Sequence, residues 1–152
     1  MISEGVSVLD FLLTKGTNVH MRIVADTNIF LAAALNETEK SIIIELTTGH
    51  DLLAPQVLSF EIGNALSAMV KRGRLTVAQG LAALDEIGKV PVELVTIDLR
   101  CALQLACRHN IYAYDAYFLE CAQAYRAPLL TLDASMRTVA KKLGISLLEI
   151  RR

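Results

Sequence analysis

The chain has 152 residues, of which 53% are apolar and 20% charged, and its formal charge is −1. This length suits one domain with a sizeable core, and the composition excludes intrinsic disorder. The longest uncharged apolar run, from Ile29 to Leu35, is far shorter than the ~20 residues that a membrane-spanning helix needs. The near-neutral charge leaves only a local basic patch for a nucleic-acid partner. Since the apolar fraction is high for a small monomer, we expect a buried interface between subunits.

The first twenty residues do not have the pattern of a signal peptide. Glu4 comes where positive charge is expected, and Asp10 interrupts the apolar stretch. A second methionine, Met21, stands directly before the clearest strand pattern. We therefore expect residues 1–20 to be an N-terminal extension, either poorly ordered or upstream of the functional start at Met21. Residues 21–152 are expected to form the domain.

Short β-branched runs then alternate with longer helical patterns. In chain order, the sequence predicts a strand at 22–25, helices at 27–35 and 38–48, a strand at 51–54, helices at 57–71 and 76–87, a strand at 92–97, helices at 99–109 and 114–125, a strand at 129–131, a helix at 135–143 and a last strand at 145–150. Thr76 and Asp98 are the expected N-caps of their helices. This alternation predicts a three-layer α/β/α domain, with a central parallel sheet of about five strands and helices on both faces.

Four acidic residues stand in unusual places in this pattern. Asp26 and Asp133 directly follow predicted strands, at the edge where ligands bind in parallel sheets. Glu61 and Asp115 lie on apolar helix faces, where a carboxylate is costly without a partner. Each also has a simpler explanation. Asp26 and Asp133 could cap the helices that follow, Asp115 could cap or charge a helix N-terminus, and Glu61 could lie at the margin of the buried face.

Four carboxylates that meet at one edge repel one another. One pair of like charges ~4 Å apart costs about 4 kcal/mol at an effective dielectric constant near ~20. Such a cluster is tolerable when a divalent cation neutralises it, and oxygen-only ligands favour Mg²⁺ or Mn²⁺. An open acidic site of this type presents a metal-bound nucleophile to a phosphate.

These residues lie in four short motifs, in a fixed order. They are Asp26-Thr27-Asn28, Glu61-Ile62-Gly63-Asn64-Ala65-Leu66, Tyr114-Asp115-Ala116 and Thr131-Leu132-Asp133. These four motifs resemble those of PIN-domain ribonucleases in their order, their spacing and their predicted secondary structure. The resemblance extends from about Met21 to Ile150. The small size resembles VapC-type toxins of type II toxin–antitoxin systems.

The resemblance implies a metal-dependent endoribonuclease that hydrolyses RNA phosphodiesters with metal-activated water. Its metal-binding and catalytic quartet would be Asp26, Glu61, Asp115 and Asp133, with Asp26 and Asp115 the foremost ligands. Groups that support the ligands or orient the substrate would be Thr27, Asn28 and Thr131. The resemblance also implies a homodimer and a small cognate antitoxin that covers the site.

Basic residues follow two of the predicted helices. Candidate contacts to RNA phosphates are Lys71, Arg72, Arg74 and Arg137, with Lys141 and Lys142 on the same helix as Arg137. Positive charge at helix C-termini is the alternative interpretation. Aromatic residues make up only 5% of the chain, which argues against base stacking as the main binding mode. The three cysteines show no metal-binding spacing and indicate a reducing cytoplasm.

Other classes of protein fit less well. A haloacid-dehalogenase-like phosphatase needs a second Asp two residues after the first, and Asn28 occupies that position. A housekeeping RNA-processing PIN nuclease stays open, as does an inactive PIN-like module that binds proteins. A neighbouring short gene for a DNA-binding protein would favour the toxin.

Overall fold

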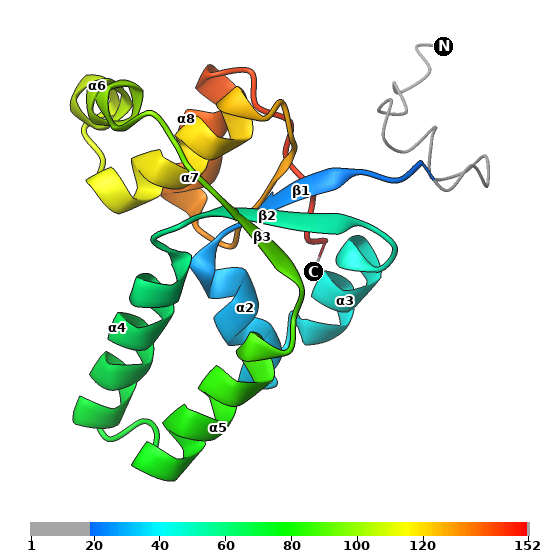
Figure 1. Ribbon diagram of the computed structural model, residues 1–152, viewed down its shortest axis with the longest axis vertical. Helices are drawn as coiled ribbons and strands as arrows, with labels where there is room; N and C mark the ends of the chain where they lie inside the picture. Colours follow the sequence, from blue (N-terminus) through cyan, green and yellow to red (C-terminus); the bar gives the residue numbers. More distant parts are fainter. Residues whose placement is uncertain (1–18, 152) are drawn as a thin grey trace.

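The computed structural model describes residues 19–151 (Figure 1), so the expected N-terminal extension lies outside this range except for its last two residues. The elements follow the predicted order, strand for strand and helix for helix, up to the final segment. They are β1 (Arg22–Ala25), α2 (Thr27–Ala34), α3 (Lys40–Thr47), β2 (Asp51–Pro55), α4 (Leu58–Lys71), α5 (Val77–Gly88), β3 (Val92–Val95), α6 (Leu99–His109), α7 (Ala113–Ala124), β4 (Leu129–Leu130) and α8 (Ala134–Lys142).

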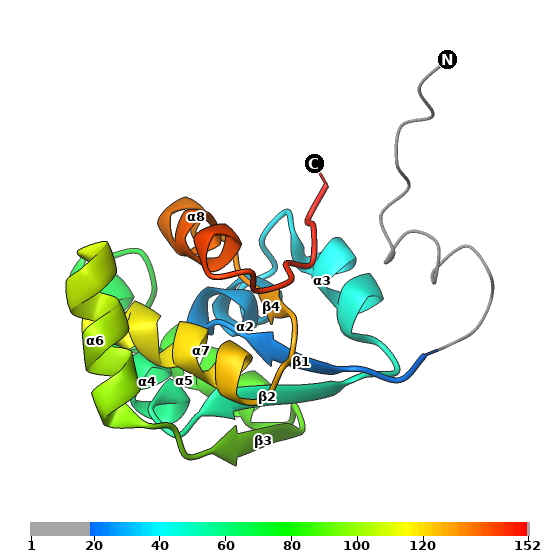
Figure 2. The same cartoon turned by 90° about the horizontal axis from the view of Figure 1, so that it is seen from above.

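The sheet confirms the predicted parallel α/β architecture. Its strands are all parallel and stand in the order β3-β2-β1-β4. Figures 1 and 2 show α6, α7 and α8 on one face of the sheet and α2, α3, α4 and α5 on the other. Ile23, Val24 and Ala25 of the central strand β1 are fully buried, as expected for a strand covered on both faces. Between residues 19 and 151, no helix is long and apolar enough to cross a membrane.

The last predicted strand is the main difference from the sequence analysis. The segment 145–150 forms only a single parallel bridge, between Leu129 and Leu147, so the described sheet has four strands and one bridge. The Leu129 N–H donates to the Ser146 carbonyl, and the Leu148 N–H donates to the Leu129 carbonyl. Because β4 has only two residues, its outer edge offers this one pairing position and cannot support a longer fifth strand.

The predicted helix caps are confirmed. The Thr76 hydroxyl accepts a hydrogen bond from the Gln79 N–H, and the Gln79 side chain accepts one from the Thr76 N–H, which together form a capping box on α5. Asp98 accepts hydrogen bonds from the N–H groups of Arg100 and Cys101 at the start of α6. Both caps support helices that frame the sheet.

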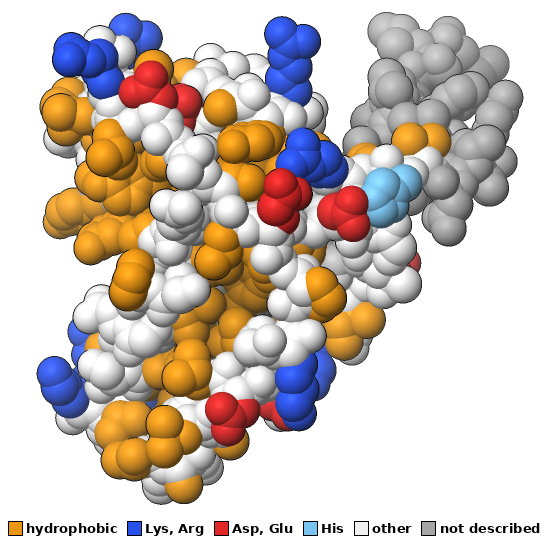
Figure 3. All heavy atoms as spheres, viewed as in Figure 1, with side chains coloured by type: hydrophobic (Ala, Val, Ile, Leu, Met, Phe, Trp, Pro, Cys, Tyr) orange, Lys and Arg blue, Asp and Glu red, His pale blue; other side chains and the backbone are white. Residues whose placement is uncertain are grey.

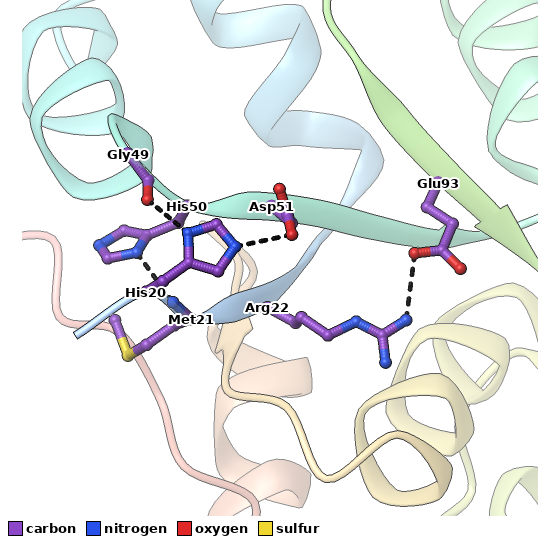
Figure 4. A network of polar contacts seen from close by, with 7 residues as sticks. All are labelled: His20, Met21, Arg22, Gly49, His50, Asp51 and Glu93. Atoms are coloured by element: carbon purple, nitrogen blue, oxygen red, sulfur yellow. Dashed lines mark hydrogen bonds and ion pairs between the residues drawn. The ribbon is translucent and has the colours of Figure 1, made fainter.

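A polar network holds the chain just before β1 (Figure 4). His20 lies between the Gly49 carbonyl, 2.9 Å from its Nδ1, and the Asp51 carboxylate, 2.7 Å from its Nε2. Both ring nitrogens face acceptors, which suits the protonated imidazole, and the hydrogen bond with Asp51 raises the pKa of His20. Arg22 pairs with Glu93 on β3 at 3.1 Å. These contacts lie at the amino ends of the strands, at the opposite edge from Asp26.

Candidate active site

The predicted acids at the strand ends also cap helices. Asp26 follows β1 and accepts a hydrogen bond from the Thr27 N–H at 2.6 Å, at the N-cap of α2. Asp133 follows β4 and accepts one from the Met136 N–H at 2.7 Å, at the N-cap of α8. Asp26 and Asp133 can therefore cap helices and also belong to an acidic site, because each capping hydrogen bond uses only one carboxylate oxygen.

Thr131 joins the two strand ends. Its hydroxyl donates to the second oxygen of Asp26 at 2.8 Å and accepts from the Asp133 N–H at 3.1 Å. The register explains this contact, because Ala25 pairs with Leu130 and the next residues of both strands, Asp26 and Thr131, therefore lie side by side. Thr131 is fully buried, so the Asp26 carboxylate is held by a rigid neighbour.

Thr27 joins the same end of β1 to α4. Its hydroxyl donates to Oε2 of Glu61 at 2.7 Å, and Glu61 lies in the first turn of α4. The two threonines that the sequence analysis named as supporting groups thus each hold one of the predicted acids. The Asn28 side chain is exposed on the first turn of α2.

The electrostatics show that the four carboxylates act on one another. Asp26 is only 6% exposed, and burial raises its pKa to about 6, although the hydrogen bonds from Thr131 and Thr27 lower it. The charges of Glu61 and Asp115 raise that pKa further. Burial followed by the charge of Asp115 raises the pKa of Glu61, against the hydrogen bond from Thr27.

Asp115 links Asp133 electrostatically to the other carboxylates. It lies in the first turn of α7, and its pKa is raised by burial and then by the charge of Asp133. No lysine or arginine in the described range is among the groups that shift the pKa values of Asp26, Glu61 and Asp115. Within residues 19–151, no basic side chain therefore offsets the negative charge on these three carboxylates.

The donor set fits a hard divalent cation. All four side chains offer carboxylate oxygen, the ligand that Mg²⁺ and Mn²⁺ prefer, and burial followed by repulsion from neighbouring carboxylates raises the pKa values of Asp26, Glu61 and Asp115. Within residues 19–151, no three His, Cys, Asp or Glu side chains lie close enough together to hold an ion as they stand. The carboxylates therefore interact over longer distances than direct coordination requires, and binding an ion needs side-chain adjustment.

The predicted basic residues do not join the carboxylates. Lys71 is the last residue of α4, which extends away from the sheet (Figure 1), and Arg72 and Arg74 follow it. At ~1.5 Å per residue, Lys71 is ~15 Å from Glu61 along the helix. Arg137 on α8 forms an ion pair with Glu149, in which 2.6 Å separate the guanidinium nitrogen from the carboxylate oxygen. Direct charge compensation of the site by these residues is thus absent.

A buried acid that the sequence analysis missed lies elsewhere on α7. Glu120 is buried among apolar residues of the helix, and burial followed by the charge of Asp98 raises its pKa. It acts on the thiols of Cys101 and Cys121, not on the quartet. Its position among Phe118, Leu119 and Cys121 was the available sequence signal.

Comparison with known proteins places this geometry in a family. The sequence model of the PIN domain matches residues 23–142. The VapC ribonuclease Mb0985 of Mycobacterium bovis is 30% identical over 111 residues, which cover 73% of this chain and 85% of the relative. Ribonuclease VapC1 of Mycobacterium tuberculosis is 33% identical over 88 residues, which cover 55% of this chain and 63% of the relative.

Solved structures show the same fold. PAE2754 from Pyrobaculum aerophilum has a TM-score of 0.64 at 20% identity, and the match covers 84% of this chain and 83% of that one. VapBC2 from Rickettsia felis, solved bound to a DNA fragment from its promoter, has a TM-score of 0.62 at 17% identity, covering 84% and 98%. The resemblance inferred from the four motifs is confirmed, and the chain belongs to the PIN domain family.

Proposed function

We propose that this protein is a metal-dependent endoribonuclease and the toxin of a toxin–antitoxin pair. The observation that carries the proposal is the buried Asp26 carboxylate, which Thr27 and Thr131 hold in place and which the charges of Glu61 and Asp115 destabilise without a nearby cation. The names of the relatives, VapC ribonucleases, support RNA as the substrate.

The proposed roles follow from the contacts. Asp26 and Asp115 would be the foremost ligands of Mg²⁺ or Mn²⁺, with Glu61 and Asp133 completing the acidic site. When bound, the ion would lower the pKa of a water molecule and polarise the phosphate. Thr131 fixes the Asp26 carboxylate, and Thr27 occupies Oε2 of Glu61, which leaves Oε1 available to accept a proton. Asn28 is exposed beside these groups and is available to orient the substrate.

Metal-dependent cleavage of RNA tests the proposal. The wild-type protein should cleave single-stranded RNA with Mg²⁺ or Mn²⁺ and stop when a chelator is added. Asp26→Asn and Glu61→Gln should each reduce the rate by roughly 10²–10⁴-fold, whereas Asp85→Asn, at an exposed acid on α5, should leave it unchanged. Cleavage that persists with the chelator or in Asp26→Asn would overturn the mechanism.

The proposed homodimer has a specific surface. Figure 3 shows apolar side chains gathered between α6 and the beginning of α4. Phe60 and Leu99 are 78% and 65% exposed, and Leu94 and Leu103 are exposed on the neighbouring β3 and α6. A contiguous apolar patch of this kind is typical of a protein interface. Leu99→Glu should convert a dimer into a monomer in light scattering, and an unchanged mass would refute this surface.

The proposed antitoxin partner has a second apolar surface. A cleft of ~340 Å³ between α4 and α5 is lined by Leu66, Val70, Leu81 and Leu84, and Glu61 lies on α4 as well. An amphipathic helix of the antitoxin could occupy this cleft and reach the carboxylates. Neighbours such as the toxin–antitoxin complex of Klebsiella pneumoniae, with a TM-score of 0.53, share the fold. Leu81→Glu should abolish copurification with the product of the adjacent gene.

Two parts of the proposal depend on context. The three free cysteines, Cys101, Cys107 and Cys121, suit a reducing cytoplasm, and this is where we place the protein.

A housekeeping RNA-processing nuclease is the alternative within the same chemistry. A gene for a small DNA-binding protein directly upstream supports the toxin, and its absence supports the housekeeping enzyme.

A further inference from the structure

The strongly exposed aromatic side chains of the described chain gather at one edge of the sheet. Phe60, Tyr112 and Tyr114 are the exposed ones. Phe60 precedes Glu61 and belongs to the proposed dimer patch, whereas Tyr112 and Tyr114 stand at the start of α7, beside Asp115. We propose that Tyr112 and Tyr114 form a stacking platform for unpaired RNA bases next to the carboxylates. This inference rests on the proposed function and names the residues that would hold the bases of the RNA beside the acidic site.

The fold does not account for Tyr112. It stands at the N-cap of α7 and makes no capping hydrogen bond through its side chain, although Ser, Thr, Asp or Asn at this position would stabilise the helix. The side chain is 85% exposed, so it contributes little to the core. The N-caps of α2, α5, α6 and α8 accept capping hydrogen bonds through their side chains, whereas those of α3 and α4, like Tyr112, do not. Because the Tyr112 ring neither caps the helix nor packs into the core, it is free for a role outside folding.

Tyr114 is exposed but braced. Its ring lies 5.8 Å from that of Tyr117 at an angle of 86°, a T-shaped contact that fixes the ring at low entropic cost. The side chain is nevertheless 54% exposed, so ring surface stays available to a ligand. A held and accessible aromatic ring is what stacking on a base requires.

Tyr114 lies beside the acidic site on α7. At ~100° per residue along a helix, Tyr114 projects between Asp115 and Tyr117. The charge of Asp115 acts on the Asp26 and Glu61 carboxylates. A strand of RNA crossing Asp115 would thus meet Tyr114.

Beside Tyr114, the charges of the protein favour binding through the bases of the RNA over binding through its phosphates. Arg137 is paired with Glu149, and Lys71 stands far along α4, so neither is placed to hold phosphates beside Tyr114. Stacking is independent of charge and accepts any base, because every base has a π-face. In a duplex these faces are already stacked and hidden, so the platform selects unpaired segments.

The test measures binding of RNA without cleavage. In an Asp26→Asn background, a fluorescein-labelled single-stranded RNA of ten nucleotides is titrated by anisotropy, alone and annealed to its complement. Tyr112→Leu and Tyr114→Leu should each weaken single-strand binding about 10-fold, whereas Tyr112→Phe and Tyr114→Phe, which keep the ring, should bind like the parent. The slope of log Kd against log salt should not change, because no phosphate contact is removed.

Cleavage separates this inference from the proposed function. In the otherwise wild-type protein, the Leu variants should raise KM for single-stranded RNA and leave kcat within about twofold. If the wild type cleaves with metal but the Leu variants bind and cleave normally, the platform is wrong and the proposed function stands. If the Leu variants keep RNA affinity but lose the dimer or the antitoxin, the tyrosines contact protein instead. If the wild type neither binds nor cleaves RNA, both proposals are overturned.

Discussion

Replacing the central carboxylate should stabilise the metal-free protein. Burial raises the pKa of Asp26 to about 6, about 2 pH units above the ordinary value of an aspartate, and each unit corresponds to about 1.4 kcal/mol. The ionised form therefore costs ~3 kcal/mol in the folded state. Asp26→Asn removes this charge and keeps a carbonyl oxygen for the Thr27 N–H. The amide can still donate to Thr131, but the Thr131 hydroxyl loses its acceptor, which costs ~1 kcal/mol.

The net expectation is a gain of ~2 kcal/mol in the free energy of unfolding at pH 7.5, or roughly 6 °C in Tm. The sign depends on pH. Since the pKa of Asp26 is raised in the folded state, the wild type loses stability as pH rises from about 4 to about 6 and above. At pH 4 the folded wild type carries a neutral Asp26, so the gain should disappear and the lost hydrogen bond should make Asp26→Asn the less stable protein.

Urea denaturation in a chelator at both pH values measures this difference. Addition of Mg²⁺ should then stabilise the wild type, because only the folded state offers the site, and should leave Asp26→Asn unchanged. The reasoning is refuted if Asp26→Asn is destabilised equally at pH 7.5 and pH 4, because the charge would then be compensated by something other than a metal ion.

Three further changes probe single contacts. Thr27→Val removes the donor to Glu61, so the cleavage rate should fall about 10-fold and the acidic limb of its pH profile should move to higher pH; an unchanged profile would mean that the contact does not tune Glu61. Thr76→Ala breaks the capping box of α5 and should lower the free energy of unfolding by ~1 kcal/mol without changing cleavage, and equal stability would contradict the cap. Glu120→Gln should stabilise the protein at neutral pH, since burial raises the pKa of Glu120, and should spare cleavage; lost activity would tie Glu120 to the site.

Much of the architecture could be predicted because it depends on local patterns. The apolar run of β1, the spacing of α4 and the caps Thr76 and Asp98 each have a signal within a few residues. The fifth strand could not be predicted in this way. Whether residues 145–150 pair depends on the length of the neighbouring strand, and β4 stops after Leu130. Strand pairing depends on both segments, so it could not be predicted from the sequence of residues 145–150 alone.

The candidate site could be predicted from the sequence to about the same extent as the fold. The positions of Asp26 and Asp133 after strands indicated a shared edge, and the motif resemblance added Thr27 and Thr131. The specific bonds, Thr131 to Asp26 and Thr27 to Glu61, depend on strand register and on the approach of α4. The expectation drawn from the low aromatic content, that base stacking is not the main binding mode, stays a prediction that the proposed role of Tyr112 and Tyr114 puts to the test.

The placement of the four acids explains how the fold tolerates them without a cation. Asp26 and Asp133 are the N-caps of α2 and α8, and Glu61 and Asp115 lie in the first turns of α4 and α7. Each helix N-terminus carries about half a positive charge, which favours a nearby anion. Helices α2, α4 and α8 each follow a parallel strand and so begin at one edge of the sheet, and α7, which follows α6, carries in its first turn Asp115, whose charge acts on the same carboxylates. The helices reduce the repulsion but do not cancel it, because after burial the charges of Glu61 and Asp115 still contribute to the raised pKa of Asp26, and the remaining negative charge is available to attract a divalent metal ion.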